Sequence, residues 1–292
     1  MLSDSLESNQ LNICADLYLD LLKNSLTDAL HERRYYWVLP RPRSLIKRAI
    51  FDSLLARGIL PTRVLDSSVR EEGAERPPSG PAWLEVTSAQ TLLGLRRLNN
   101  LQQCVEEVLK DDVPGDLVET GVWRGGASIL MRAILKARGV HHRKVWAADS
   151  FEGLPVGDPT RYPLDRNSTF HRERGFAVSI EEVRHNFEKY GLLDDQVEFV
   201  KGWFCETLPK LTAHRWGVIH LDGDMYQSTF EALMNLYPGL SVGGYIIIDD
   251  FGAVPACQQA VLDFRRENRI KEDIREIDWT GVCWRRASPQ SG

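Results

Sequence analysis

The sequence predicts an α/β fold, a doubly wound and mainly parallel β-sheet with helices on both faces and a helical N-terminal extension. From residue 116 onward, short runs rich in valine, isoleucine and aromatic residues are interspersed with long helical stretches, which is the pattern of a parallel sheet. Glycine or proline marks several helix ends, as at Gly139, Gly191 and Pro255. With 292 residues, the chain is long enough for one large domain and appendages.

The main domain is expected to contain five strands joined largely through helices. The strands are expected at 116–122, 144–149, 197–202, 216–222 and 245–249. The helices are expected at 126–139, 179–191, 226–236 and 256–268. A capping box of Ser179 and Glu182 opens the second of these helices. The last segment, IREIDWTGVCWRR at 274–286, is expected to form one bent strand or a terminal hairpin.

The N-terminal part is expected to be largely helical over residues 10–58, because leucines recur there at helical spacing, at Leu19, Leu22, Leu26 and Leu30. A further helix is expected over 88–110. Its apolar face would consist of Leu95, Leu98, Leu101, Val105 and Val108.

Three segments follow from these patterns. We expect an N-terminal helical segment at 1–65, a linker or mobile loop at 66–82, and the main domain at 83–292. The linker is indicated by the polar stretch DSSVREEGAERPPSG, which contains prolines and glycines. Within the main domain, the connection over 152–179 is long and carries three prolines, so we expect a lid near 152–178.

Composition and charge exclude several classes of protein. A hydrophobic fraction of 43% and a charged fraction of 26% are ordinary for a globular protein. The net charge is −5, and no lysine- or arginine-rich block is interleaved with aromatic residues, which disfavours a nucleic-acid partner. No apolar run approaches the ~18 residues of a membrane span, and the N-terminus does not resemble a signal peptide. The five cysteines are scattered without a CxxC pair, so we interpret them as buried neutral thiols in a cytoplasmic protein.

The stretch ETGVWRGGAS at 119–128 follows the first strand of the main domain and opens its first helix. Its glycines permit a tight turn, but their spacing is not GxGxxG and no GK[ST] follows, so a phosphate-binding P-loop is excluded. Asp149 ends the next strand, where a carboxylate can accept both hydroxyls of a ribose. Glu119 is an acceptor-only carboxylate suited to an ammonium group. S-adenosylmethionine, with a cationic amino-acid end and a ribose, fits this pair better than a pyrophosphate does.

Four aspartates follow two of the expected strands: Asp222 and Asp224, and then Asp249 and Asp250. The carboxyl ends of neighbouring parallel strands share one edge of a sheet, so these side chains are expected to meet beside the cofactor. Ionised carboxylates close together repel one another, and a divalent cation removes the conflict. Ligands that are all oxygen favour Mg²⁺. We expect Asp222, Asp249 and Asp250 to bind the metal and Asp224 to act as the general base; the alternative is that the aspartates only cap the following helices.

The motifs VPGDLVETGVWRGGAS, DSFEGLP, VKGWFCETLP, LDGDMYQST and GGYIIIDDFG together closely resemble the macrocin O-methyltransferase family. The resemblance covers nearly the whole chain except about 50–80. It implies a class I methyltransferase fold that uses S-adenosylmethionine and Mg²⁺, usually as a homo-oligomer. It also implies methylation of a sugar hydroxyl on an antibiotic glycoside, a small-molecule substrate.

Carried onto this sequence, the resemblance places Glu119 and Gly121 at the methionine end of the cofactor, Asp149 at the ribose, and Trp203 with Gly202 at the adenine. The full expected set of cofactor-binding residues is Glu119, Thr120, Gly121, Ser128, Asp149, Ser150, Gly202 and Trp203. The sequence departs from the family at His220, where relatives often carry arginine, and at Phe251, often tyrosine. Both departures bear on substrate fit.

Three alternatives stay open at this point. The first is a methyltransferase acting on a hydroxyl of a small molecule that is not a sugar. The second is a dinucleotide-dependent oxidoreductase, which predicts nicotinamide binding and no metal requirement. The third is a non-catalytic S-adenosylmethionine-binding protein or scaffold. Among the tryptophans only Trp203 has a motif behind it, so Trp216, Trp279 and Trp284 are interpreted as core packing.

Overall fold

The computed structural model describes residues 2–30, 35–38, 44–56, 62–65, 83–85 and 88–287. Its contacts divide the chain into two compact units. Met1–Thr27 and Gln90–Gly292 together form one unit, and Asp28–Ala89 forms the other. The first helix therefore belongs to the same unit as most of the residues expected to form the main domain, and that unit resumes at Gln90 and not at residue 83.

Among its described residues, the smaller unit contains an antiparallel sheet and one helix. Its strands are β1 (Tyr35–Val38), β2 (Thr62–Leu65) and β3 (Trp83–Glu85), in the order β2-β1-β3, and its helix is α2 (Leu45–Ala56). The strands β1 and β2 differ from the helical segment expected over 1–65, and β3 lies among residues expected to belong to the main domain. The sequence YYWV of β1 consists of aromatic and β-branched residues, which favour strands. The predicted linker at 66–82 lies outside the described residues.

The larger unit is built on a seven-stranded sheet in the order β6-β5-β4-β7-β8-β10-β9. The strands β6, β5, β4, β7 and β8 pair in parallel, whereas β10 runs antiparallel to β8 and to β9. This arrangement confirms the doubly wound, mainly parallel fold and makes the C-terminal segment a hairpin. The strands are β4 (Asp116–Thr120), β5 (Val145–Asp149), β6 (Val197–Lys201), β7 (Trp216–Leu221), β8 (Leu240–Ile248), β9 (Arg275–Glu276) and β10 (Val282–Arg285).

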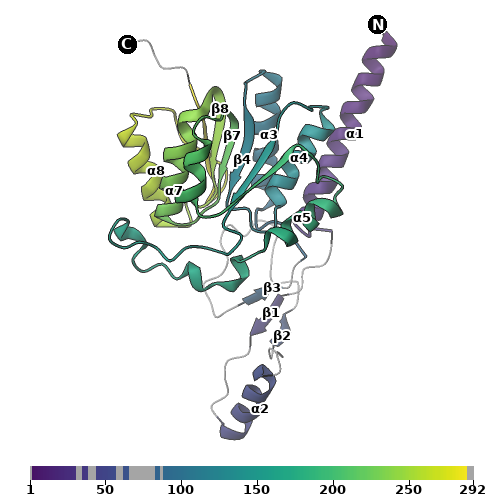
Figure 1. Ribbon diagram of the computed structural model, residues 1–292. Helices are drawn as coiled ribbons and strands as arrows, with labels where there is room; N and C mark the ends of the chain where they lie inside the picture. Colours follow the sequence, from purple (N-terminus) through teal and green to yellow (C-terminus); the bar gives the residue numbers. More distant parts are fainter. Residues whose placement is uncertain are drawn as a thin grey trace. The chain divides into compact units, whose positions relative to one another are not determined.

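Helices cover both faces of this sheet (Figure 1). The helices on one side are α1 (Leu2–Leu26), α3 (Leu95–Lys110), α4 (Gly126–Ala137) and α5 (Ile180–Lys189), and those on the other are α7 (Tyr226–Leu236) and α8 (Pro255–Glu267). The short helix α6 (Phe204–Thr207) follows β6. Helix α3 begins at Leu95 and not at residue 88, because Gly94 before it has an extended backbone. Helix α1 ends at Leu26, so Leu30 lies beyond it and is exposed.

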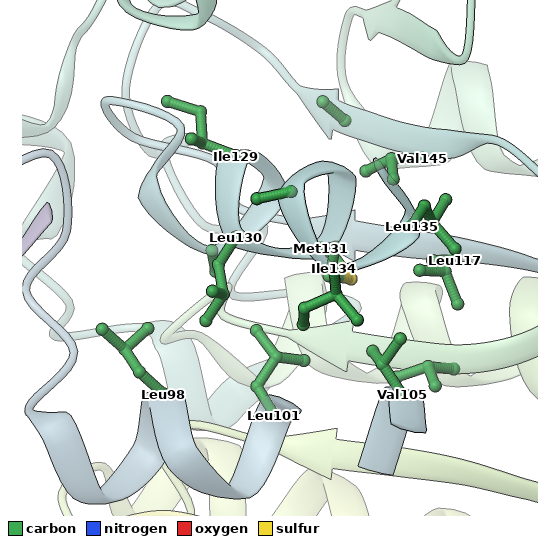
Figure 2. Packing of buried hydrophobic residues seen from close by; sticks show 14 of the residues in the cluster. Leu98, Leu101, Val105, Leu117, Ile129, Leu130, Met131, Ile134, Leu135 and Val145 are labelled. Carbon is green, nitrogen blue, oxygen red and sulfur yellow. The ribbon is translucent and has the colours of Figure 1, made fainter. Parts of the chain in front are cut away.

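Successive residues of the strands pack into two separate cores. In β4, Leu117 belongs to the core under α3 and α4, whereas Val118 belongs to the core under α7 and α8. The same alternation occurs in β7, with Val218 on the first side and Ile219 on the second. Figure 2 shows part of the first core, in which the side chains of Leu98 on α3 and Leu130 on α4 point toward each other. Burial on both faces fixes the register of the strands and therefore the positions of their ends.

The cysteines only partly match their expected burial. Cys104, Cys257 and Cys283 are buried, but Cys14 and Cys205 are exposed, and all five are free. In the described part of the chain, no helix combines the length and apolar character needed to cross a bilayer.

Candidate active site

A cavity of about 580 Å³ lies at the carboxyl ends of the parallel strands. This is where ligands bind in open α/β sheets. All four strand-end aspartates line it, as do Glu119, Gly121, Asp149, Ser150 and Trp203. Three other residues expected to bind the cofactor, Thr120, Ser128 and Gly202, are not among its lining residues.

Gly121 joins the end of β4 to the end of β7. It has a φ of 85°, and a Cβ atom there would lie 1.5 Å from the carbonyl oxygen of Asp222. The backbone N–H of Asp222 donates to the carbonyl of Thr120 over 2.8 Å, just before this contact. From the sequence we expected the glycine to leave room for a ligand. In the structure, glycine is needed here because the backbone of residue 121 lies against the backbone of Asp222.

Glu119 faces the cavity and has two side-chain neighbours, Ser128 and His220. It is 2% exposed and accepts a hydrogen bond from the hydroxyl of Ser128 on α4. Nδ1 of His220, on β7, lies 3.4 Å from its other carboxylate oxygen. Ser128 therefore orients Glu119, and His220, one of the departures from the family pattern, is a neighbour of the same carboxylate.

Asp149 organises the two loops that follow β4 and β5. Its carboxylate accepts the backbone N–H of Val122 over 2.6 Å and that of Phe151 over 2.7 Å. Burial raises the pKa of Asp149, and these backbone hydrogen bonds act in the opposite direction. The backbone N–H of Gly202 donates to the carbonyl of Asp149 over 2.9 Å, which brings the Gly202–Trp203 turn to the same end of the cavity.

The three aspartates predicted to bind metal converge. Asp222, Asp249 and Asp250 each offer a carboxylate oxygen, and these oxygens lie within 4.8 Å of one another. The cause is the parallel pairing of β7 with β8, in which Leu221 lies opposite Ile248 and the backbone N–H of Asp249 donates to the carbonyl of Leu221 over 2.9 Å. The two strand ends are therefore adjacent, as the sequence predicted.

The charges of this cluster are poorly accommodated by the protein alone. Burial, and then the charges of Asp249 and Asp250, raise the pKa of Asp222 well above its usual range. Burial, together with the charges of Asp224 and Asp249, does the same to the pKa of Asp250. Ionised carboxylates in such an arrangement favour either a bound proton or a bound cation.

Asp224 lies beside the cluster in a backbone conformation that is unusual for aspartate. Its φ is 56°, in the left-handed region, and its backbone N–H donates to Oδ2 of Asp250 over 3.1 Å. Burial, and then the charge of Asp249, raise the pKa of Asp224 to about 6. A carboxylate with a raised pKa beside a reacting hydroxyl is suited to general-base chemistry.

Sequence reasoning missed Arg97, on α3. Its guanidinium donates to Oδ2 of Asp249, and its Nε lies 3.1 Å from a carboxylate oxygen of Asp278. Burial acts to lower the pKa of Arg97, but the neighbouring carboxylates outweigh burial and raise it. The sequence does contain a signal that could have identified Arg97. It precedes the buried Leu101 by four residues, so a charged residue lies on the apolar face of the helix.

The segment 152–178 contains three short 3₁₀ helices, Pro163–Asp165, Phe170–Arg172 and Arg174–Phe176. Hydrogen bonds that involve side chains hold it at several points, of which two are the shortest. The buried carboxylate of Asp165 accepts the backbone N–H groups of Tyr226 and Gln227 at the start of α7, over 3.0 and 2.8 Å. Further along, Nε1 of Trp123 donates to the carbonyl of Gly175 over 2.8 Å.

Trp279 is not a core residue, which corrects the sequence-based interpretation. It is 43% exposed and lines the cavity from the loop between β9 and β10. Trp216 and Trp284, in contrast, are 0% and 2% exposed and belong to the core under α7 and α8. Residue type alone does not distinguish these cases.

The chain matches known proteins over almost its entire length. The family model for macrocin O-methyltransferase (TylF) matches residues 15–286. A tetracenomycin-C 4'-O-methyltransferase of Streptomyces olivaceus, whose full name specifies a dimethoxy-rhamnosyl substrate, is 48% identical over 271 residues, which is 92% of each chain. The mycinamicin III 3''-O-methyltransferase of Micromonospora griseorubida is 41% identical over 276 residues, covering 94% of this chain and 97% of the relative.

A solved structure agrees with these relatives. The O-methyltransferase NovP is 42% identical and superimposes with a TM-score of 0.76, covering 94% of this chain and 100% of NovP. The chain described here therefore belongs to the macrocin O-methyltransferase (TylF) family and is an S-adenosylmethionine-dependent O-methyltransferase.

Proposed function

We propose that this enzyme transfers a methyl group from S-adenosylmethionine to a hydroxyl of a deoxysugar on a glycosylated natural product, and that it requires Mg²⁺. The observation that carries the proposal is the convergence of Asp222, Asp249 and Asp250 in the cofactor cavity. The sugar is supported by a relative, the Streptomyces olivaceus enzyme, whose name specifies a rhamnosyl group. A methyltransferase acting on a non-sugar hydroxyl is the alternative.

The residues present fit a magnesium ion. Their donor atoms are all carboxylate oxygens, which Mg²⁺ prefers. In addition, Oδ1 of Asp249 is buried and has no hydrogen-bond partner among the described residues, whereas Oδ2 is occupied by Arg97. An unsatisfied buried oxygen beside two further carboxylates is the expected state of a metal ligand without its ion.

The other half of the cavity fits S-adenosylmethionine. Glu119 is an oriented acceptor for the ammonium group at the end of β4. Asp149 lines the cavity at the end of β5, where we propose that it accepts ribose hydroxyls in addition to its hydrogen bonds with the loop backbone. Trp203 follows β6, the strand next to β5 at one edge of the sheet, and lines the cavity there. We propose that the adenine binds at this place.

The residues of the chain divide the reaction between them. When bound, the metal ion supplies Lewis acidity and a template for the acceptor oxygens. Asp224 accepts the proton of the acceptor hydroxyl. The hydroxyl oxygen attacks the methyl carbon of the sulfonium, and the bond between that carbon and sulfur breaks. Glu119 and Asp149 hold the cofactor so that its methyl group is close to that oxygen. The segment 152–178, fixed at Asp165 and Gly175, would act as a lid that excludes water.

Several properties stay predictions from the sequence. They are a cytoplasmic location, a homo-oligomeric state, and the absence of nucleic-acid and membrane partners. Gel filtration with light scattering would determine the oligomeric state.

The proposal is tested by assaying the enzyme with S-adenosylmethionine and a panel of demethylated deoxysugar glycosides, with Mg²⁺ and with EDTA. We expect one or more glycosides to gain the mass of one methyl group, only when the metal is present. Methylation confined to non-sugar hydroxyls, or no methylation of any glycoside, would reject the deoxysugar substrate.

A further inference from the structure

Part of the cavity lining is apolar and has no part in the chemistry described above. Three large apolar side chains line the cavity and are nevertheless exposed: Leu92 is 61% exposed, Val156 is 75% exposed and Trp279 is 43% exposed. They come from three segments, namely the residues before α3, the segment 152–178, and the loop between β9 and β10. Single exposed apolar residues are ordinary, but three of them on one cavity are typical of a binding surface.

The strand order indicates which part of the ligand reaches Trp279. Trp203, Asp149 and Glu119 occupy the ends of β6, β5 and β4, whereas the aspartate cluster occupies the ends of β7 and β8. Trp279 precedes β10, which is next to β8 on the side away from β4. The cofactor and Trp279 are therefore on opposite sides of the carboxylates, and the acceptor has to fill the part of the cavity toward Trp279.

The backbone around Trp279 is held to Asp249, one of the three proposed metal ligands, and to Arg97. The carboxylate of Asp278 pairs with Nε of Arg97 and accepts the backbone N–H of Thr280 over 3.0 Å. The hydroxyl of Thr280 donates to the carbonyl of Asp249 over 2.8 Å. A half-exposed indole on a fixed backbone loses little freedom on contact with a ligand, which is the property of an aromatic anchor.

We propose that Trp279, with Leu92 and Val156, forms an apolar subsite that binds the aglycone of the acceptor and determines specificity for it. The inference rests on the proposed function and adds to it the part of the acceptor that is recognised outside the sugar. Apolar side chains cannot hydrogen-bond the hydroxyls of a sugar, but they remove the apolar surface of an aglycone from water. The sugar hydroxyl would instead lie at the three metal-binding aspartates and at Asp224.

The experiment compares two acceptors that share the sugar identified by the glycoside panel: its 2-naphthyl glycoside and its methyl glycoside. In Trp279→Ala we expect KM for the naphthyl glycoside to rise roughly tenfold or more, because an aromatic contact surface is lost. KM for the methyl glycoside, KM for S-adenosylmethionine and kcat are expected to stay within about twofold, because the lost contact contributes to binding and not to the chemical step. Trp279→Phe is expected to retain most of the preference for the naphthyl glycoside.

Leu262→Ala is the matched control, because Leu262 is 42% exposed but does not line the cavity. It should leave both KM values unchanged. An equal loss on both acceptors in Trp279→Ala, or no loss on either, would overturn the aglycone subsite while the proposed function stands. If the wild-type enzyme methylates no glycoside in the panel, the proposed function fails, and the subsite fails with it.

Discussion

The two carboxylate oxygens of Asp249 have different surroundings. Oδ2 accepts a hydrogen bond from Arg97, whereas Oδ1 is buried with no partner in the described part of the chain. Arg97 thus balances part of the negative charge of the cluster and holds one oxygen of Asp249, which leaves the other oxygen without a partner. A single residue from a distant helix prepares the proposed metal site.

For Asp224, the expected result of Asp224→Asn is a fall in kcat of about 10²- to 10⁴-fold, because the amide keeps the shape of the side chain but cannot accept the proton. The Kd for S-adenosylmethionine, measured by calorimetry, should stay near the wild-type value, because Asp224 is not among the residues that we expect to hold the cofactor. Wild-type turnover in this variant would show that another group is the base.

For Arg97, we expect Arg97→Gln to lower the free energy of unfolding in EDTA by about 3–5 kcal/mol, because the buried carboxylates of Asp249 and Asp278 lose their positively charged partner. Mg²⁺ should recover part of this loss, since the ion neutralises Asp249. Thermal and denaturant unfolding with and without Mg²⁺ measure both effects. Arg96→Gln is the control, because Arg96 is its exposed neighbour; equal destabilisation by the two substitutions would contradict the role given to Arg97.

At the scale of elements, the ends of the parallel strands determine where the site lies. Pairing of β7 with β8 brings Asp222 next to Asp249, and pairing of β4 with β5 brings Glu119 and Asp149 to the same edge. These placements were predictable because a strand end can be recognised locally, from an apolar run followed by a carboxylate. The bounds of α7 at 226–236 and the Ser179 cap of α5 were also predictable, because residues close together in the sequence determine them.

The elements that sequence reasoning missed depend on distant contacts. Arg97 and Trp279 reach the cavity only because α3 and the β9–β10 loop pack beside the end of β8. The strands β1 and β2 were missed because each is only four residues long and is stabilised by pairing across a long separation in the chain. The periodicity of a short stretch of sequence does not indicate contacts with residues far away in the chain.

The contact between Asp165 and the start of α7 gives a prediction at this scale. Asp165→Ala removes a carboxylate that satisfies two N–H groups of a helix N-terminus, a loss of about 0.5–2 kcal/mol. The segment 152–178 should therefore open more often, and trypsin should cleave at the exposed Arg161 and Arg166 roughly three- to thirtyfold faster. Mass spectrometry of the fragments measures the rates. Asp195→Ala, at an exposed position, is the control; unchanged cleavage in Asp165→Ala would mean that this contact does not hold the segment.

At the scale of the whole molecule, one cavity joins the half that we propose for the cofactor, at the ends of β4 to β6, to the half that we propose for the acceptor, at the ends of β7 and β8 and the start of β10. The boundary between the halves is the aspartate cluster, in which burial and the neighbouring carboxylates raise the pKa of Asp222 and that of Asp250. Under our account, the enzyme works only when a divalent cation occupies this boundary, because the acceptor oxygen and the donor methyl group meet there.

The most direct test of this claim is methyl transfer measured after the enzyme has been stripped with EDTA and dialysed into metal-free buffer. The account predicts that activity on the identified glycoside disappears and returns when Mg²⁺ is added back, with half-restoration at a concentration that rises sharply in Asp249→Ala. Full methyl transfer by the stripped enzyme in the continued presence of chelator would contradict it.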